Sequence, residues 1–301
     1  KAKNLLFNSE CIAIPTETVY GLAGNAYSDK ACKKIFKIKK RPKNNPLIVH
    51  YYNYQDLKKD CNFNNNFLKL YKKFCPGPIT FILDLKRNSK ISKFVTNKKK
   101  TLAVRFPKHP ITRSLLKEIK FPLAAPSANL SKKVSAVCSS DVKDDFGTKI
   151  KYILEGGKSS IGIESTIIDL RKKPKILRLG GLAISTIQKA LNQKIKIQNN
   201  PSNISAPGQF KLHYSPGIPI RLNVKRIKDK EAYILIRKKK IIKSNYYFLS
   251  KKGDLKEAAK NLYTTLRKIK KNKFKSIAVT KIPNFGLGKT INDRLIRASK
   301  Y

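Results

Sequence analysis

Hydrophobic and polar positions follow two different periods over the first two thirds of the chain. Apolar runs such as Ile79–Leu85 and Thr101–Arg105 have the length of buried strands, whereas Lys30–Lys39 places its apolar residues at helical spacing. Alternating strands and amphipathic helices predict a mixed α/β layer. Asp29 stands where an N-cap would open the first helix. We predict further strands at Cys11–Pro15, Leu47–His50, Leu123–Ala125, Tyr152–Leu154, Ser165–Asp169 and Ile176–Arg178, and further helices at Phe67–Phe74, Ile111–Ile119 and Ile184–Asn192.

The pattern changes in the last third of the chain. Residues 197–217 are rich in proline and glycine, which break helices and sheets, and they predict a linker between a domain at 1–196 and a second domain at 218–301. The second domain resembles a small Rossmann-like α/β unit without its glycine fingerprint. Its predicted strands are Ile218–Leu222, Ala232–Ile236, Tyr246–Leu249 and Ser276–Thr280, and its predicted helices are Lys256–Lys270 and a final one near Ile291–Ser299.

The composition favours a cytoplasmic protein that does not span a membrane. No apolar run reaches 18 residues, and the basic start at Lys1–Phe7 passes into a strand without the cleavage site of a secretory signal. The five cysteines are scattered, without the close pairs of a zinc site, and their odd number suggests reduced thiols. We assign no metal ligands among the side chains.

The formal net charge of +49 has two interpretations. A polyanion such as tRNA would gain affinity from counterion release at each neutralised phosphate. Alternatively, the charge reflects compositional drift, since lysine is spread over the whole chain together with Asn and Ile. We favour drift, because clustering is the useful mark of a nucleic-acid surface. We expect only weak, non-specific attraction of ATP and tRNA.

One apparent nucleotide motif does not meet the requirements of a P-loop. Gly286–Thr290 reads GLGKT, but the glycine required five positions before Gly288 is replaced by Pro283. Proline has no amide hydrogen to offer a phosphate. We predict a tight turn before the last helix at this point.

Five short polar motifs lie at the ends of predicted strands. They are PTETVYGL after Ile14, KKRP with NPLIVH up to His50, APSAN around Ser127, IESTIIDL around Ser165, and ILRLGG around Arg178. Hydroxyls, amides and cations suit anion binding at such positions, because α/β sheets place ligands at strand ends. Each motif alone also has an ordinary interpretation, such as an Asx turn or a solvated basic loop.

These motifs, in order with CPGPIT and VRFP, resemble the YrdC-type threonylcarbamoyl-AMP synthase family over residues 9–185. HYSP at His213–Pro216 and the closing GLGKTINDRLIRAS resemble its long, two-domain form. The resemblance implies an open, twisted mixed α/β sheet with a positively charged cavity. It also implies synthesis of L-threonylcarbamoyladenylate and pyrophosphate from ATP, L-threonine and bicarbonate or CO₂. A separate threonylcarbamoyl transferase complex would then modify tRNA next to the anticodon.

The resemblance implies roles for individual residues. Lys39 and Arg41 would be catalytic, although Lys40 stands where the family often has glycine and leaves the choice between Lys39 and Lys40 open. The threonine end would be lined by Thr16, Arg41, His50 and Thr166. ATP would be held by Lys39, Arg105, Ser127, Asn129, Ser165 and Arg178. His213 and Tyr214 would form a lid, and Mg²⁺ would accompany ATP with no protein ligand assigned.

Two other functions fit part of the sequence. A non-enzymatic RNA-binding protein would explain the charge, but the basic residues lack interleaved aromatics for base stacking, and the anion-site motifs would have no purpose. A carbamoyl transferase of the hydrogenase-maturation type also contains a YrdC-like domain. Proteins of that type carry zinc-finger-like and acylphosphatase modules, of which the sequence shows neither.

Overall fold

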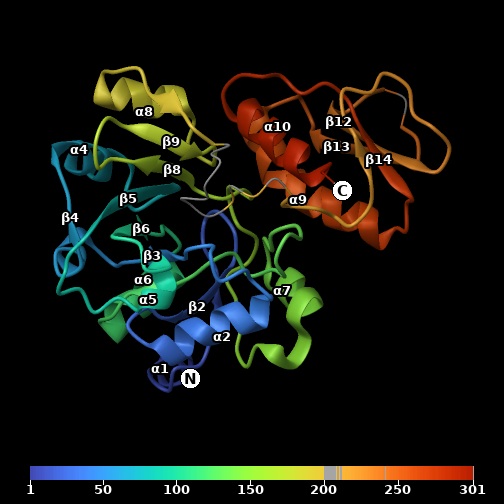
Figure 1. Ribbon diagram of the computed structural model, residues 1–301. Coiled ribbons are helices and arrows are strands. Elements are labelled where there is room, and N and C mark those ends of the chain that lie inside the picture. The colour runs from blue at the N-terminus through green and yellow to red at the C-terminus, as the bar shows by residue number, and fades with distance from the viewer. Residues whose placement is uncertain (200–207, 209, 211, 241, 301) are drawn as a thin grey trace.

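The structure is a computed structural model that describes residues 1–199, 208, 210, 212–240 and 242–300. Two sheets, each packed against helices, lie side by side (Figure 1). The larger sheet lies within residues 12–197 and the smaller within residues 220–279, and no strand pairing joins them among the described residues. Residues 200–207, 209 and 211 of the predicted linker lie outside the described part.

Ten strands of the described chain form one mixed sheet. They are β1 (Ile12–Ile14), β2 (Gly21–Asn25), β3 (Ile48–His50), β4 (Cys61–Asn62), β5 (Ile79–Leu85), β6 (Thr101–Arg105), β7 (Leu123–Ala124), β8 (Thr166–Asp169), β9 (Lys175–Arg178) and β10 (Lys196–Ile197). Their order is β1-β2-β7-β3-β6-β5-β8-β9-β10, and β4 pairs with β5. Parallel pairs such as β3 with β6 and β5 with β8 are mixed with antiparallel ones. This confirms the predicted mixed α/β fold.

The helix α2 (Asp29–Lys39) shows how the local sequence sets an element that reaches the site. Its buried face carries Ala31, Cys32, Ile35 and Phe36, at the spacing of one helical face. The N-cap is Ser28, whose hydroxyl accepts the amide of Ala31, so the prediction of Asp29 as N-cap was wrong by one residue. The other helices of this domain are α1 (Ala2–Phe7), α3 (Tyr54–Leu57), α4 (Asn65–Phe74), α5 (Lys93–Thr96), α6 (Pro110–Ile119), α7 (Ser139–Phe146) and α8 (Ile184–Leu191).

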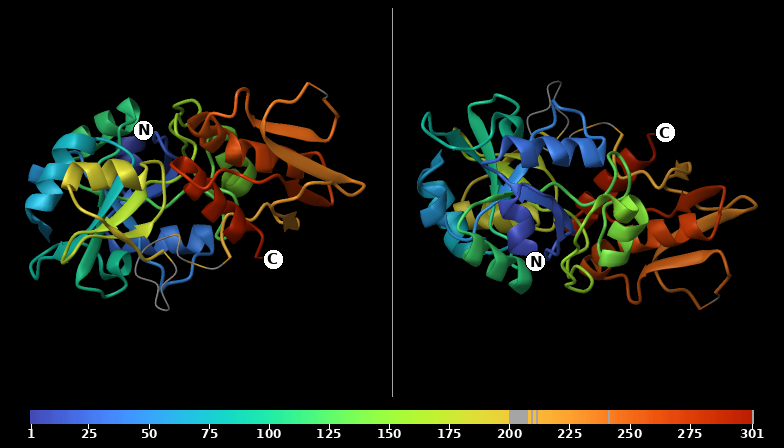
Figure 2. Two further views of the ribbon diagram at one scale, coloured as in Figure 1. Left: turned by 90° about the horizontal axis from the view of Figure 1, so that it is seen from above. Right: turned by 90° about the horizontal axis from the view of Figure 1, so that it is seen from below.

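The second domain is a small parallel α/β unit, as predicted. Its strands are β11 (Ile220–Arg221), β12 (Glu231–Arg237), β13 (Tyr246–Ser250) and β14 (Ser276–Val279). They pair in the order β11-β14-β12-β13, and every pairing is parallel. The helices α9 (Leu255–Lys271) and α10 (Leu287–Ala298) lie between this sheet and the large domain (Figures 1 and 2).

The two domains share a buried apolar interface. Val19, Val134 and Ile163 of the large domain belong to the same apolar cluster as Leu262 of α9. At Gly162, whose φ is +75°, a Cβ atom would overlap the backbone of α9. Only glycine tolerates both this φ and this close approach, so the contact between this loop and α9 requires glycine at position 162.

Two further local predictions were wrong. Tyr152–Leu154 is not a strand, because Ile153 forms only an isolated bridge with Ala13. The predicted turn at GLGKT is the first turn of α10, which begins at Leu287 after Gly286 with φ +49°. The hydroxyl of Thr290 in that turn donates to the carbonyl of Gly180 at 3.1 Å, so the segment serves packing between the domains.

The cysteines are free thiols, and the described helices stay short of a membrane span. All five thiols are free, and burial raises the pKa of Cys11 to about 12 and that of Cys32 to about 11. These two side chains are therefore protonated and unreactive at neutral pH. In the described part of the chain, no helix combines the length and the apolar character needed to cross a bilayer.

Candidate active site

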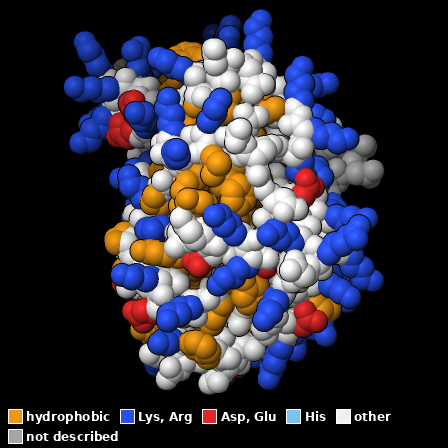
Figure 3. Space-filling model, turned by 90° about the vertical axis from the view of Figure 1, so that its left-hand side faces the viewer, with side chains coloured by type: hydrophobic (Ala, Val, Ile, Leu, Met, Phe, Trp, Pro, Cys, Tyr) orange, Lys and Arg blue, Asp and Glu red, His pale blue; other side chains and the backbone are white. Residues whose placement is uncertain are grey.

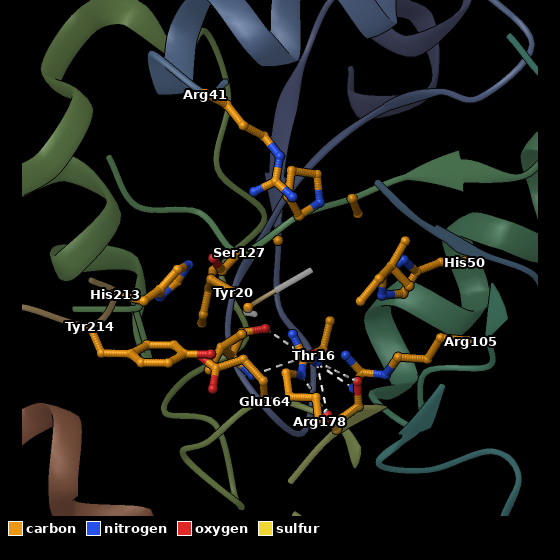
Figure 4. A pocket seen from close by; sticks show the side chains of 17 residues that line it. Thr16, Tyr20, Arg41, His50, Arg105, Ser127, Glu164, Arg178, His213 and Tyr214 are labelled. Atoms are coloured by element: carbon orange, nitrogen blue, oxygen red, sulfur yellow. Dashed lines mark hydrogen bonds between the residues drawn. The ribbon is translucent and has the colours of Figure 1, made fainter. Parts of the chain in front are cut away.

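A cavity opens between the large sheet and the linker (Figure 4). Its walls come from residues 16–21, the loop after α2, the ends of β3 and β6, residues 125–127 and 164–165, and the end of β9. The linker adds Gly208, His213 and Tyr214. A concave site with several converging polar side chains is where proteins usually bind small molecules.

Most residues predicted for the site line this cavity, and Figure 4 shows the labelled side chains directed toward one space from several segments. They are Thr16, Arg41, His50, Arg105, Ser127, Ser165, Arg178, His213 and Tyr214. Lys39, Asn129 and Thr166 are buried in the surrounding wall and do not line the cavity themselves. The motifs therefore meet in space although they are spread over about 200 residues of sequence.

The proline-containing loop after α2 positions Arg41. The Nε atom of Arg41 donates to the carbonyl of Asn45 at 3.1 Å, and its Nη2 donates to the carbonyl of Pro46 at 2.8 Å. These bonds hold the guanidinium against the cavity. Burial and the neighbouring charge of Arg178 lower the pKa of Arg41 to about 9, because a buried cation loses its hydration and is repelled by another cation.

The structure places Lys39 and Lys40 in different environments. Lys39 ends α2, and its Nζ atom donates to the backbone carbonyls of Ser127 and Asn129. Burial and the charge of Arg41 keep the pKa of Lys39 well below its usual range. Lys40 is exposed and has a left-handed backbone with φ 49°. Of the two lysines, Lys39 is therefore the one that contacts the cavity wall, where it holds the loop that carries Ser127.

Asn129 and Thr166 brace the wall of the cavity. The Nδ2 atom of Asn129 donates to the carbonyls of Leu130 and Lys133 at 2.7 and 2.9 Å, while its Oδ1 atom is buried without a hydrogen-bond partner in the described part of the chain. The hydroxyl of Thr166 donates to the carbonyl of Leu182 at 2.6 Å and accepts the amide of the same residue at 3.1 Å. These bonds fix the backbone on either side of the cavity.

Arg105, at the end of β6, is paired inside the protein. Its Nη2 atom donates to Glu17 Oε1 at 2.7 Å and to the Thr16 hydroxyl at 3.5 Å. The other oxygen of Glu17 accepts the amide of Lys108 at 2.9 Å. Because Glu17 balances its charge, Arg105 attracts an additional anion less than Arg41 does. It lies beside Thr16, at the predicted threonine end, although we predicted it for ATP.

The neighbouring strands β8 and β9 bring Ser165 and Arg178 together. The Nη2 atom of Arg178 donates to the carbonyl of Ser165 at 2.8 Å and to its hydroxyl at 3.0 Å. The same hydroxyl bonds to that of Thr80 at 2.7 Å. Gly180 packs so closely on the backbone of Ser165 that a Cβ atom there would overlap it. The IEST and ILRLGG motifs therefore form one continuous wall.

Two buried histidines line the cavity in their neutral form. Burial, with the charge of Arg105, holds the pKa of His50 well below its usual range, and burial lowers the pKa of His213 to about 3. The Nδ1 atoms of both rings are buried, and no described residue forms a hydrogen bond with either. Neutral imidazoles can bond to a substrate without adding to the positive charge of Arg41 and Arg178.

The cavity also contains residues that the motifs did not lead us to assign. The hydroxyl of Tyr20 donates to the carbonyl of Gly157 at 2.9 Å and accepts the amide of Gly156 at 3.1 Å. Glu164, directly before Ser165, is buried and lines the cavity. The only signal for Glu164 was its place in the IEST motif, since its partners include residues of the second domain.

Comparison with known proteins gives matches over both domains. Residues 4–180 match the family described as telomere recombination, and residues 182–300 match the family described as the C-terminal domain of threonylcarbamoyl-AMP synthase. This chain belongs to the threonylcarbamoyl-AMP synthase family. It is therefore an enzyme of the nucleotidyltransferase type, and the match at 182–300 favours the synthase over both alternative functions.

Individual relatives of the family match nearly end to end. The threonylcarbamoyl-AMP synthase of Pyrococcus abyssi is 35% identical, over 100% of this chain and 93% of that protein. The Bacillus subtilis synthase is 34% identical, over 99% of this chain and 92% of its own length. The crystal structure of P. abyssi Sua5 complexed with L-threonine matches with a TM-score of 0.91 at 32% identity, covering 100% of this chain and 93% of that one.

Proposed function

We propose that this cavity makes L-threonylcarbamoyl-AMP and pyrophosphate from ATP, L-threonine and bicarbonate or CO₂. The observation that carries the proposal is the pair of buried cations Arg41 and Arg178, which line the same cavity and repel each other. An anionic ligand between them would relieve that repulsion. The P. abyssi relative whose structure contains L-threonine supports the amino-acid half of the reaction.

The proposed chemistry needs no protein nucleophile. The amine of threonine takes up CO₂ or bicarbonate to form a carbamate, with water released in the case of bicarbonate. A carbamate oxygen then attacks the α-phosphorus of ATP, and the bond from that phosphorus to the β-phosphate bridging oxygen breaks, so pyrophosphate leaves. The protein contributes by holding two anions close together and stabilising the charge that develops on the phosphates.

The positions of the side chains suggest how the substrates divide the cavity. We assign Thr16 and His50 to the threonine end, and Thr166 acts there by bracing the wall. Ser127, Ser165 and Arg178 contact the nucleotide, while Asn129 supports the Ser127 loop. Arg41 lies between the two groups in this assignment, binding the phosphates and the carboxylate or carbamate of the substrate. Lys39 supports the Ser127 loop from behind the wall.

Two further features belong to the proposal. His213 and Tyr214 come from the linker and would act as a lid that excludes water. Magnesium would enter with ATP. The acidic side chains Glu17 and Glu164 of the pocket region are paired with arginines, so the metal would take most of its ligands from phosphate and water. We propose that a tRNA-modifying threonylcarbamoyl transferase complex in the cytoplasm uses the product.

The deciding experiment measures pyrophosphate release from ATP with and without L-threonine and bicarbonate, with L-serine as the control amino acid. We expect release to require both threonine and bicarbonate and to be much slower with serine. Release at the same rate without threonine would refute the proposed reaction. Tight, salt-sensitive RNA binding without any pyrophosphate release would favour a binding protein instead.

A further inference from the structure

Arg294 of α10 is a buried cation that does not line the cavity and yet contacts two residues that do. Its side chain has an exposed fraction of 0%. Burying a guanidinium costs hydration energy, and well-packed apolar residues often give equal stability, so a buried ion pair by itself is a weak stabiliser. The contacts of Arg294 therefore call for a role in addition to stability.

The first of these contacts is with Glu164, the residue before Ser165. Arg294 Nε donates to Glu164 Oε2 at 2.9 Å, and the Nη2 atom of Arg294 donates to the carbonyl of Leu179 at 2.6 Å. Glu164 also accepts hydrogen bonds from Tyr263 of α9 at 2.8 Å and from Ser135 at 2.6 Å. One arginine of the second domain thus contacts both motifs that form the Ser165 wall.

The second contact is with the linker. The guanidinium carbon of Arg294 lies 4.6 Å from the centre of the Tyr214 ring, a cation–π distance. The ring of Tyr263 stacks with Tyr214 at 5.8 Å between centroids. Tyr214 is fully buried, and its hydroxyl, which has no hydrogen-bond partner among the described residues, points into the cavity in Figure 4. The amide of His213 donates to the carbonyl of Arg297, one turn further along α10, at 3.3 Å.

We propose that Arg294 is the positioning residue by which the second domain holds Glu164 and the linker residue Tyr214 at their places in the cavity wall. The inference rests on the proposed function and gives the second domain a part in it. Arg294 does not touch the substrates in this proposal. It acts by keeping His213 and Tyr214 of the linker against a wall that is already bound to the same side chain, so the second domain helps to complete the cavity.

The test compares Arg294→Met with Arg267→Met in threonine-dependent pyrophosphate release. Arg267 is a matched control, because it also joins the second domain to the first, donating to Asp145 at 2.8 Å and to the carbonyl of Val134 at 2.7 Å, neither of which lines the cavity. If the arrangement with His213 and Tyr214 in the cavity wall is populated to about a tenth in Arg294→Met, the KM for threonine rises about tenfold at nearly unchanged kcat. Arg267→Met is expected to lose thermal stability and keep the KM.

Coupling to the linker separates positioning from a merely structural role. Tyr214→Leu is expected to raise the same KM, and adding Arg294→Met to it should raise the KM little further, since both changes release one contact. Arg294→Lys keeps a charge for Glu164 but loses the planar fork, and its KM is expected to fall between those of Arg294→Met and the unaltered protein. An unchanged KM in Arg294→Met, or fully additive effects of the two changes, would overturn the proposal.

Hydrogen exchange of the amides of residues 212–215 and 217 provides a readout that needs no catalysis. We expect these amides to exchange at least about tenfold faster in Arg294→Met than in the unaltered protein, and at the unaltered rate in Arg267→Met. Equal exchange in the two variants would refute the positioning role. If the unaltered protein releases no pyrophosphate, the proposed function fails, whereas the exchange result still decides whether Arg294 holds the linker. Should Arg294→Met fail to fold, Arg294→Lys takes its place in both measurements.

Discussion

Single side chains in the cavity are held in states that favour an anionic ligand. Arg41 and Lys39 both have lowered pKa values because they are buried near other cations, and His50 and His213 are neutral for the same reason. Charges and dipoles that are fixed before the ligand arrives need little rearrangement when it binds. The mutual repulsion of these cations is therefore part of how the site would recognise ATP.

Replacing Arg41 tests this arrangement most directly. We expect Arg41→Ala to lower kcat/KM for pyrophosphate release by at least about 100-fold, or about 3 kcal/mol of transition-state stabilisation. The melting temperature should change little, because a repelled, buried cation is removed. Lys40→Ala is the matched control, since Lys40 is exposed on the same loop. Near-normal turnover in Arg41→Ala, or an equal loss in Lys40→Ala, would contradict the assignment.

The buried histidine of the linker makes stability depend on pH. The pKa of His213 is lowered from 6.5 to about 3, so between these values the unfolded chain binds a proton that the folded chain does not. The free energy of unfolding therefore falls as the pH drops below 6.5, by about 2 kcal/mol between pH 7 and pH 5. His50 acts in the same direction.

Calorimetry at pH 7 and pH 5 measures this effect. The drop in melting temperature should be smaller for His213→Gln than for the unaltered protein. The carboxyl of Glu164 does not interfere, because its lowered pKa, from 4.5 to about 2, confines its contribution to lower pH. Equal drops in the two proteins would show that His213 is not buried as described.

Among the secondary structure elements, α9 packs closely on the large domain at Gly162, in addition to its apolar and polar contacts elsewhere. We expect Gly162→Ala to lower the free energy of unfolding by about 2–4 kcal/mol, because it combines a positive φ with overlap on the backbone of Lys260. Gly157→Ala is the control, since its φ is +67° with nothing within 4 Å of the added atom. Denaturant unfolding should show a loss of about 1 kcal/mol for that variant. Equal losses in the free energy of unfolding of both variants would mean that the domain contact at Gly162 does not contribute to stability.

Elements with a clear hydrophobic pattern, either a helical period or a continuous apolar run, were predictable from the sequence. Elements without such a pattern were not. The limits of β5 and β6 agree with the sequence, because their continuous apolar runs are buried between neighbouring strands. The strand β2 was missed because GLAGN offers small residues where a strand signal needs large ones. The helix α7 was missed because most of its side chains are polar.

The site was predictable as far as its residues lie in motifs at strand ends. Strand order then brings these motifs together, as the cavity shows. The contact of Glu164 with Arg294 spans 130 residues of sequence and two domains. No local pattern signals such a pair, because both residues look like ordinary charged positions in a chain that is 28% charged.

Over the whole molecule, the positive charge is widespread. Figure 3 shows lysine and arginine side chains scattered over one face, with no single basic stripe. With a net charge of +49, such a surface attracts polyanions without selecting among them. This agrees with compositional drift on the face shown.

Binding of RNA tests that interpretation. We expect tRNA and an unrelated RNA of equal length to bind with affinities within about threefold of each other. Raising the salt from about 50 to about 200 mM should weaken both by about a thousandfold or more, as counterion release requires. Filter binding at both salt concentrations measures this. A preference for tRNA that persists at the higher salt concentration would point to a selected surface.

The apolar cluster shared by the two domains has a consequence for synthesis on the ribosome. Val19, Val134 and Ile163 are covered by α9 only in the finished protein. The first residue of α9 follows Ile163 by about ninety positions, which takes roughly 5–18 s at ordinary translation rates. During that interval the nascent large domain exposes this apolar surface to solvent, and its cavity at first still lacks the residues that the linker supplies. Chaperone demand should therefore peak late in translation, and a stop codon within the second domain should leave an aggregating fragment instead of a smaller enzyme.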